Sequence, residues 1–168
     1  MMNKSRMYRN LVMILTIVIL VGCDQISKNI VRHSLEYNER IAVFDHFITM
    51  TKVENTGAFL GLGSNVHRGI YSVLMIVLPL LVLCYAFYYL FSRNNTWLLI
   101  SGLCLIISGG IGNIIDRILY GSVTDFLHFN FGIFQTGIVN AADMEITAGF
   151  VVLLLEMYLH REKKVTGE

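Results

Sequence analysis

The chain has little charge and almost no proline. Only 15% of its 168 residues are charged and a single proline is present, whereas 55% are hydrophobic. Soluble domains contain about 25% charged and about 45–50% apolar residues. Together with a mean hydropathy of +0.61, this composition indicates a membrane protein. The formal net charge of +1 gives no electrostatic reason to expect a nucleic acid as a partner.

The sequence also lacks the usual patterns of metal, redox and nucleophilic sites. Its three cysteines, an odd number, follow no metal or redox spacing, and each lies within or at the end of an apolar run. We therefore expect them to be small buried apolar residues. The five histidines are scattered without an HExxH motif. No metal and no cofactor is expected.

Four segments qualify as membrane spans, which need about 20 predominantly apolar residues. The central segments Gly69–Phe91 and Asn94–Ile115 are uncharged. The first segment, however, continues into Asp24 and Lys28, and the last holds Asp143, Glu145 and Glu156. Acids within a span are tolerated where they face the bundle interior or water, so these two helices are expected to carry the polar function. We predict a single integral membrane domain over residues 1–168, with spans at about residues 10–33, 69–91, 95–116 and 138–160.

The first hydrophobic segment has two interpretations. Basic residues precede the run LVMILTIVILVGC, as in a secretory signal peptide, and Leu20-Val21-Gly22-Cys23 resembles a bacterial lipobox, whose cysteine becomes lipidated. Asp24 and Lys28, however, are spaced i,i+4 and can pair on one helix face. Because three more spans follow, we interpret the segment as an uncleaved first transmembrane helix with an unmodified Cys23.

The basic residues predict the orientation of the spans. Four spans place both tails and the short second connection on one side, and these segments hold Lys4, Arg6, Arg9, Arg93, Arg161, Lys163 and Lys164. Positively charged short segments stay in the cytoplasm, so both termini are expected there. The outer loop at about residues 34–68 contains IAVFDHFITMTKVEN, whose β-branched and aromatic residues predict short strands. Residues 126–136 are expected to form a second outer loop.

This topology gathers polar residues near the outer face. Two carboxylates held close together share a proton at neutral pH and can activate water, as in aspartic proteases. Asp24 has Lys28 as a partner and Asp116 is adjacent to Arg117, and a salt-bridged acid mainly supports structure. Asp125 and Asp143 have no basic neighbour within several positions, so we favour them as the pair, with capping or interfacial solvation as the alternative. The candidates for this pair are Asp24, Asp116, Asp125, Asp143 and Glu145.

Several motifs in this region resemble those of lipoprotein signal peptidase (signal peptidase II), the bacterial intramembrane aspartic peptidase that cleaves lipidated prolipoproteins. They are NTGA at 55–58, GNIIDRILYGSVTDF at 112–126 and NAAD at 140–143, and Asp24-x-x-x-Lys28 resembles the family's first-helix motif. NTGAFL and VNAAD depart from the usual NxGAAF and FNxAD at apolar positions, which affects pocket shape rather than chemistry.

The resemblance implies a mainly α membrane protein, a bundle of four transmembrane helices with a small extracytoplasmic β-cradle, an outer loop and an extracytoplasmic helix. It implies that Asp125 and Asp143 are catalytic and activate a water for cleavage before the diacylglyceryl-cysteine. The amides of Asn55, Asn113 and Asn140 can hold an extended substrate backbone, and Arg117 can bind a carbonyl, orient an acid or pair with Asp116 alone. The other motif residues expected to support the site are Asp24, Lys28, Gly112, Asp116 and Ala142.

The same resemblance implies partners and a location. Lipidated prolipoproteins and membrane lipids are the expected partners, the enzyme is expected to act as a monomer in the bacterial cell membrane, and the active site is expected near the outer face. Cyclic peptide inhibitors of the globomycin type are expected to bind. No nucleic acid is expected as a partner.

Two other functions would use the same residues. An ion-coupled transporter would use the acids as a proton relay, but relays place acids near mid-membrane, and four short spans would suffice only in an oligomer. An assembly subunit would use the polar cluster to hold helix ends together. Clustering of the acids at one face favours the peptidase.

Overall fold

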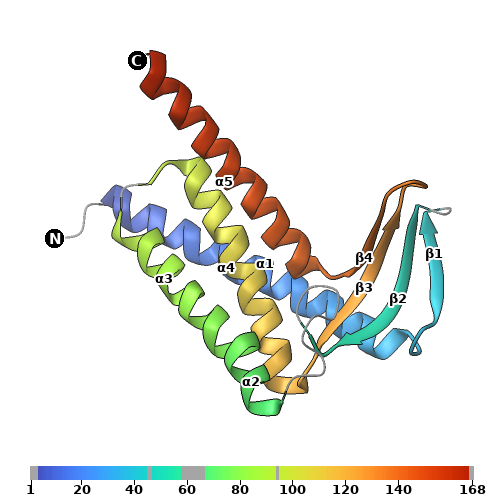
Figure 1. Ribbon diagram of the computed structural model, residues 1–168. Helices are drawn as coiled ribbons and strands as arrows, with labels where there is room; N and C mark the ends of the chain where they lie inside the picture. Colours follow the sequence, from blue (N-terminus) through green and yellow to red (C-terminus); the bar gives the residue numbers. More distant parts are fainter. Residues whose placement is uncertain (1–3, 45–46, 58–66, 94, 167–168) are drawn as a thin grey trace.

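The computed structural model describes residues 4–44, 47–57, 67–93 and 95–166. It shows a helical bundle that carries a four-stranded antiparallel sheet at one end (Figure 1). The sheet order is β1-β2-β3-β4. In chain order the elements are α1 (Lys4–Ser34), β1 (Arg40–Phe44), β2 (Ile48–Asn55), α2 (Arg68–Ser72), the π-helix η2 (Val73–Val77), α3 (Leu78–Ser92), α4 (Trp97–Tyr120), β3 (Val123–Asn130), β4 (Gln135–Val139) and α5 (Ala141–Thr166).

The predicted membrane helices are present, with shifted ends. α1, the continuous helix Gly69–Ser92 and α4 are each long and apolar enough to cross a membrane. α5, at 26 residues, is also long enough to cross a membrane but is more polar. Two of its acids are bonded within the bundle, because Glu145 accepts a hydrogen bond from Ser108 Oγ (2.7 Å) and Glu156 accepts one from Thr96 Oγ1 (2.6 Å). Such pairing is how a membrane helix accommodates acids.

The sheet corrects two predictions and confirms one. The short strands predicted in the first outer loop are present as β1 and β2. Residues 126–136, predicted as a loop, instead fall largely in the antiparallel hairpin of β3 and β4. For the same reason α5 begins at Ala141 rather than at residue 138, because residues 135–139 pair in the sheet. The resemblance also implies an extracytoplasmic helix but does not place it at particular residues. Residues 58–66 of the first outer loop lie outside the described part of the chain.

The second span contains a π-helical turn directly before its proline. Pro79 has no N–H to donate to the preceding turn, and its ring would clash with a carbonyl there. The wider turn Val73–Val77 removes this conflict, since Leu78 N–H donates to Val73 O, five residues back. The span therefore stays continuous through its proline.

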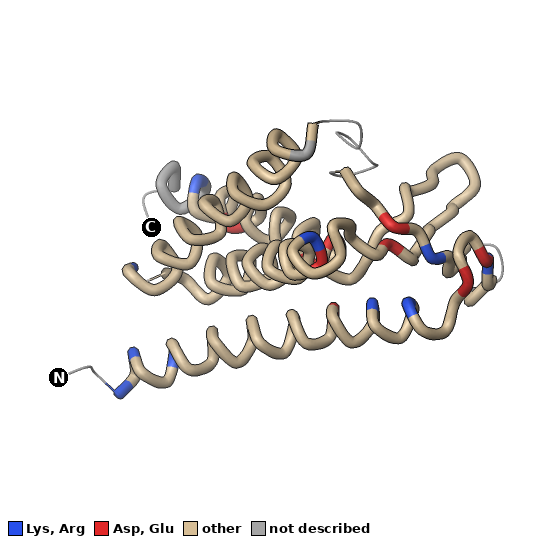
Figure 2. Tube along the Cα trace, turned by 90° about the horizontal axis from the view of Figure 1, so that it is seen from below, with Lys and Arg blue, Asp and Glu red and all other residues tan. Residues whose placement is uncertain are grey.

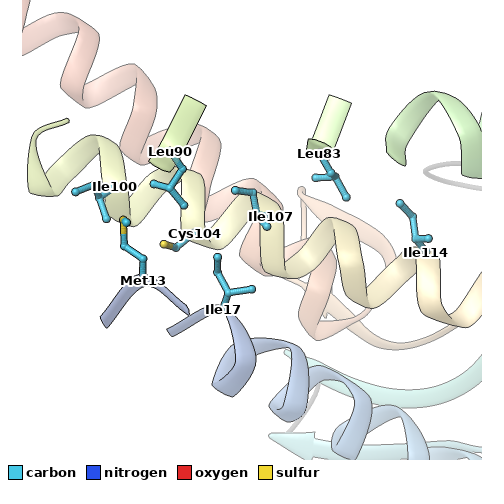
Figure 3. Close-up of a cluster of buried hydrophobic side chains, with 8 residues drawn as sticks. All are labelled: Met13, Ile17, Leu83, Leu90, Ile100, Cys104, Ile107 and Ile114. Carbon is cyan, nitrogen blue, oxygen red and sulfur yellow. The ribbon is translucent and has the colours of Figure 1, made fainter. Parts of the chain in front are cut away.

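α4 is the centre of the bundle and packs against α1, α3 and α5. Its contact with α5 is close because small residues face each other there. A Cβ at Gly149 would lie 2.7 Å from the Gly102 carbonyl oxygen, and one at Gly109 would collide with the Ala142 carbonyl. Small residues at such interfaces let membrane helices approach each other closely. On the other side of α4 lies the apolar core, formed by Met13, Ile17, Leu83, Leu90, Ile100, Cys104, Ile107 and Ile114 (Figure 3).

The outer surface of the bundle is apolar, as a membrane requires. Large hydrophobic side chains are exposed on every long helix, among them Val18, Leu81 and Leu154. The charged residues of α1 gather at its two ends (Figure 2). Burial of all three cysteines was a wrong prediction, because only Cys104 is buried, while Cys23 and Cys84 lie on this apolar surface.

Candidate active site

Asp125 lies in β3, where its position is set by the pairing with β2. The register joins Val53 to Asp125 and Asn55 to Val123, so Asn55 and Asp125 are diagonal neighbours on one face of the sheet. Asn55 Nδ2 donates a hydrogen bond of 2.9 Å to Asp125 Oδ2. The Asp125 residue is only 3% exposed, which places one candidate carboxyl in a nearly dry environment.

Asp143 lies in the first turn of α5, and the NAAD motif forms the cap of that helix. Asn140 Oδ1 accepts a hydrogen bond from the Asp143 N–H (2.9 Å), and Asp143 Oδ2 accepts one from the Asn140 N–H (3.3 Å). This reciprocal pair is a capping box, which satisfies N–H groups that the helix itself leaves free. The capping box therefore fixes the Asp143 side chain at the N-terminus of α5.

Two asparagine amides join the carboxyl groups into one site. Asn140 Nδ2 donates to Asp125 Oδ1 at 2.6 Å, and Asn113 Nδ2 donates to Asp143 Oδ1 at 2.9 Å. The two amides also contact each other, because Asn140 Nδ2 lies 3.3 Å from Asn113 Oδ1. The structure thus brings together Asp125, Asp143 and the three predicted asparagines.

The two aspartates differ in their surroundings. Burial raises the pKa of Asp125 to about 6, and the charge of Asp143 acts in the same direction, against the opposing effect of the amides of Asn55 and Asn140. Asp125 therefore keeps a proton to higher pH than an ordinary aspartate. A neutral carboxyl beside a carboxylate is the arrangement that aspartic proteases use to activate water.

A buried charged cluster supports the site from α1. Lys28 Nζ lies 2.8 Å from Asp24 and 3.1 Å from Asp116, and it donates to Asn113 Oδ1 at 2.9 Å. Arg32 lies 2.9 Å from Asp116, so two basic groups balance two acidic ones. Pairing of this kind makes buried charges tolerable.

Of the alternatives for Arg117, pairing with Asp116 alone is the one that the contacts contradict. Asp116 instead contacts Lys28 and Arg32, while Arg117 donates to two carbonyls, those of Gly57 (3.1 Å) and Asn113 (3.3 Å). Neighbouring residues on a helix point in different directions, which explains the separation. Both contacts are hydrogen bonds to backbone carbonyls, which agrees with the alternative that Arg117 binds a carbonyl.

The close packing at Gly112 and Ala142 holds the elements of the site together. A Cβ at Gly112 would collide with Asp24 Oδ2, so only glycine fits there without displacing that carboxylate. The Ala142 N–H donates to Asp24 Oδ1 at 3.0 Å. Asp24 thereby links α1 to both α4 and α5 at the level of the aspartates.

Sequence reasoning missed Arg32, which anchors β3. Its Nε donates to Thr124 Oγ1 at 2.8 Å, and its guanidinium lies 4.0 Å from the Tyr120 ring centroid. A signal was available, because Asp24, Lys28 and Arg32 are spaced four apart and share one helix face. Glu145, another acid considered, bonds to Ser108 rather than to either aspartate. Within the described ranges, no group of three or more His, Cys, Asp or Glu side chains is arranged to hold a metal ion.

Membrane-spanning helices, a small sheet and two aspartates joined through asparagine amides define the class: a polytopic membrane protein with a cluster of carboxyl and amide groups at one end of its bundle. A sequence model of signal peptidase (SPase) II matches residues 16–159. The chain belongs to the signal peptidase II family and is a peptidase. The family predicted from the motifs is therefore confirmed, and neither the transporter nor the assembly subunit gains support.

Curated relatives and solved structures agree with this family. The lipoprotein signal peptidase of Borreliella burgdorferi is 33% identical over 169 residues, covering 97% of this chain and 98% of its own length. That of Clostridioides difficile is 35% identical over 150 residues, with 89% and 97% covered. A bacterial membrane enzyme solved by the in meso method has a TM-score of 0.82 at 26% identity, with 91% of each chain covered. This similarity supports the membrane-enzyme fold.

Proposed function

We propose that Asp125 and Asp143 are the catalytic pair of this signal peptidase. The proposed reaction removes signal peptides from diacylglyceryl-modified prolipoproteins by cleavage before the lipidated cysteine. The observation that carries the proposal is the Asn140 side chain, whose amide bonds to Asp125 and whose oxygen caps the helix turn that holds Asp143. One residue therefore contacts both aspartates, of which Asp125 is buried and Asp143 is partly exposed.

The raised pKa of Asp125 supports a proposed division of roles, with Asp125 as the acid. Asp143 is proposed as the base that takes a proton from a water held between the two groups. The water oxygen attacks the scissile carbonyl carbon while Asp125 donates its proton to the carbonyl oxygen, giving a tetrahedral gem-diol. Asp143 then passes its proton to the amine nitrogen, the C–N bond breaks, and a hydroxyl proton returns to Asp125. No covalent acyl-enzyme forms.

The amides and Arg117 are proposed to position the substrate. Asn55, Asn113 and Asn140 present amide groups around the pair, and an extended peptide offers backbone groups that such amides bind. Arg117 Nη2 donates to the Gly57 carbonyl, and a substrate carbonyl is a group of the same kind. A substrate must be extended here because a helix hides its carbonyls.

The topology supports a location for the site. α1 begins and α5 ends at the side of the bundle away from the sheet (Figure 1), and the basic residues of α1 include a group in its first turns. Both termini are proposed to be cytoplasmic, with the sheet and the aspartates near the outer face. The enzyme is also proposed to act as a monomer. Membrane lipids would surround its apolar surface, and globomycin-type cyclic peptides are proposed to compete at the aspartate pair.

The aspartate pair is tested by Asp125→Asn and Asp143→Asn, each assayed on a lipidated precursor in detergent. Removal of either the acid or the base is expected to lower cleavage by about 10²–10⁴-fold. Glu39→Gln, an isosteric change at an exposed position in the outer loop, is the control and should cleave like wild type. Thermal unfolding must show that each variant is folded. Full cleavage by either aspartate variant would contradict the assignment.

A further inference from the structure

A cavity of about 580 Å³ lies between the β3–β4 hairpin and the first turns of α5. Phe129, Phe134 and Val139 line it from the hairpin, and Met144 and Ala148 line it from the helix, while Asp143 forms part of its wall. Its volume lies within the range of sites that hold small molecules. The cavity is therefore an apolar space that reaches one of the two proposed catalytic carboxyls.

Exposed apolar side chains lie beside the cavity on both the hairpin and α5. At the tip of the hairpin, Ile133 is fully exposed and Phe131 and Phe134 are more than half exposed, and Met144 is also exposed on α5. Figure 1 shows β4 leading directly into α5, so both surfaces belong to the same end of the bundle. Large exposed apolar patches mark membrane or partner contacts, and here the patch continues the lipid-facing surface of α5. The cavity thus lies beside exposed apolar side chains that a membrane would cover.

We propose that this cavity binds one acyl chain of the substrate's diacylglyceryl group. The inference rests on the proposed function, in which the lipidated cysteine directly follows the bond that is cut. Its lipid must leave the aspartate pair within one residue of the scissile carbonyl and still reach the bilayer. The cavity provides that route, because Asp143 is at one part of its wall and exposed apolar side chains surround the rest.

Two other cavities are less suited to this chain. A groove of about 670 Å³ between α3 and α4 is apolar, with Leu83, Phe87 and Ile111 in its wall. None of the described residues that line it belongs to the aspartate site, so a lipid there would be remote from the cut. A cavity of about 660 Å³ on the sheet is lined by polar side chains that include Arg40, Thr51 and His128. That lining suits a polar group better than an acyl chain.

Filling the cavity tests the proposal. Ala148 is a small exposed residue in its wall, and Ala148→Phe would place a ring where the chain lies. Since lipid or detergent is as apolar as the cavity, the chain is held by packing rather than by transfer from water. Two synthetic precursor peptides with the same sequence, one with a dipalmitoyl and one with a dibutyryl glyceryl-cysteine, report the effect of chain length.

The readout is the ratio of kcat/KM for the long-chain peptide to that for the short-chain peptide. Ala148→Phe is expected to lower this ratio at least about tenfold, the effect of overfilling a packed site. Ser101→Phe adds a ring to a lipid-facing position on α4 outside the cavity and should leave the ratio unchanged. An unchanged ratio in Ala148→Phe, or an equal loss on both peptides, would overturn the acyl site. Failure of wild type to cleave either peptide would instead overturn the proposed function.

A second measurement locates the chain without relying on turnover. The Asp125→Asn protein is mixed with the long-chain peptide carrying a diazirine in one acyl chain, irradiated and analysed by mass spectrometry. Adducts on β4 and the first two turns of α5 are expected. Adducts in the groove between α3 and α4, or spread evenly over the lipid-facing helices, would exclude the proposed cavity.

Discussion

At the scale of single residues, Lys28 organises the site although it contacts neither proposed catalytic carboxyl. Its ammonium donates to Asn113 Oδ1, and an amide whose oxygen faces Lys28 must turn its NH₂ group toward Asp143. The observed 2.9 Å bond from Asn113 to Asp143 is the result. Asp24 and Asp116 hold the ammonium in place. The charged cluster therefore acts on the chemistry by fixing the direction of an amide.

The raised pKa of Asp125 predicts how cleavage depends on pH. Burial brings this pKa to about 6, and the neutral carboxyl is the form that donates a proton to the substrate. As pH rises through about 6, kcat/KM, which reports the free enzyme, is expected to fall about tenfold per unit. A profile from pH 5 to pH 8 on a lipidated peptide measures this. A flat profile over that range would contradict the role of Asp125 as the acid.

The same ionisation affects stability with a definite sign. The pKa of Asp125 is higher in the folded protein than its ordinary value of 3.8, so the folded state holds the proton more tightly. This contribution to stability is fully present below pH 3.8 and is lost as pH rises through about 6, with a total of about 3 kcal/mol. Asp125→Asn carries an amide that does not titrate, so its stability relative to wild type should increase across this window. Thermal unfolding in detergent at each pH checks it.

At the scale of elements, the first turn of α5 is both a helix cap and part of the active site. Asn140 supplies the cap oxygen and also the amide that bonds to Asp125. Asn140→Ser keeps a cap oxygen without the amide, whereas Asn140→Ala removes both. Both variants should lose cleavage, but Asn140→Ser is expected to be about 1 kcal/mol more stable than Asn140→Ala. Equal unfolding temperatures for the two would show that the cap adds no stability.

The elements also show what the sequence can predict. Hydropathy located the long helices, because about 20 apolar residues leave few alternatives. The β3–β4 hairpin was not found, since FLHFNFGIFQT is short and its strands depend on pairing with β2. Asp125 and Asp143 are predicted as a pair because they lack basic neighbours in the sequence, and the structure joins them through Asn113 and Asn140. The partners of Asp116 were not, because Lys28 and Arg32 lie on another helix and only packing brings them together.

At the scale of the whole molecule, α1 is required along its full length. Met13 and Ile17 lie in the apolar core with residues of α3 and α4 (Figure 3), and Asp24 and Lys28 complete the aspartate site. The lipobox-like bond between Gly22 and Cys23 lies between these two regions. Cleavage there would separate the segment that carries Met13 and Ile17 from the rest of the chain. Loss of each large core side chain lowers the free energy of unfolding by about 2–5 kcal/mol.

This arrangement predicts that the enzyme does not process its own first helix, although Cys23 is exposed. A protease of this kind needs an extended segment, whereas the Gly22–Cys23 bond lies in the middle of a regular helix, Lys4–Ser34, anchored on both sides. The intact mass of active protein should therefore correspond to the full 19.0 kDa chain, with no diacylglyceryl group on Cys23. Cys23→Ala, which cannot be lipidated, is the control and should differ in mass from wild type only by the substitution, with the same activity. A wild-type chain that begins at a lipidated Cys23 and is absent from the Asp125→Asn protein would show self-processing and contradict the structural role of α1.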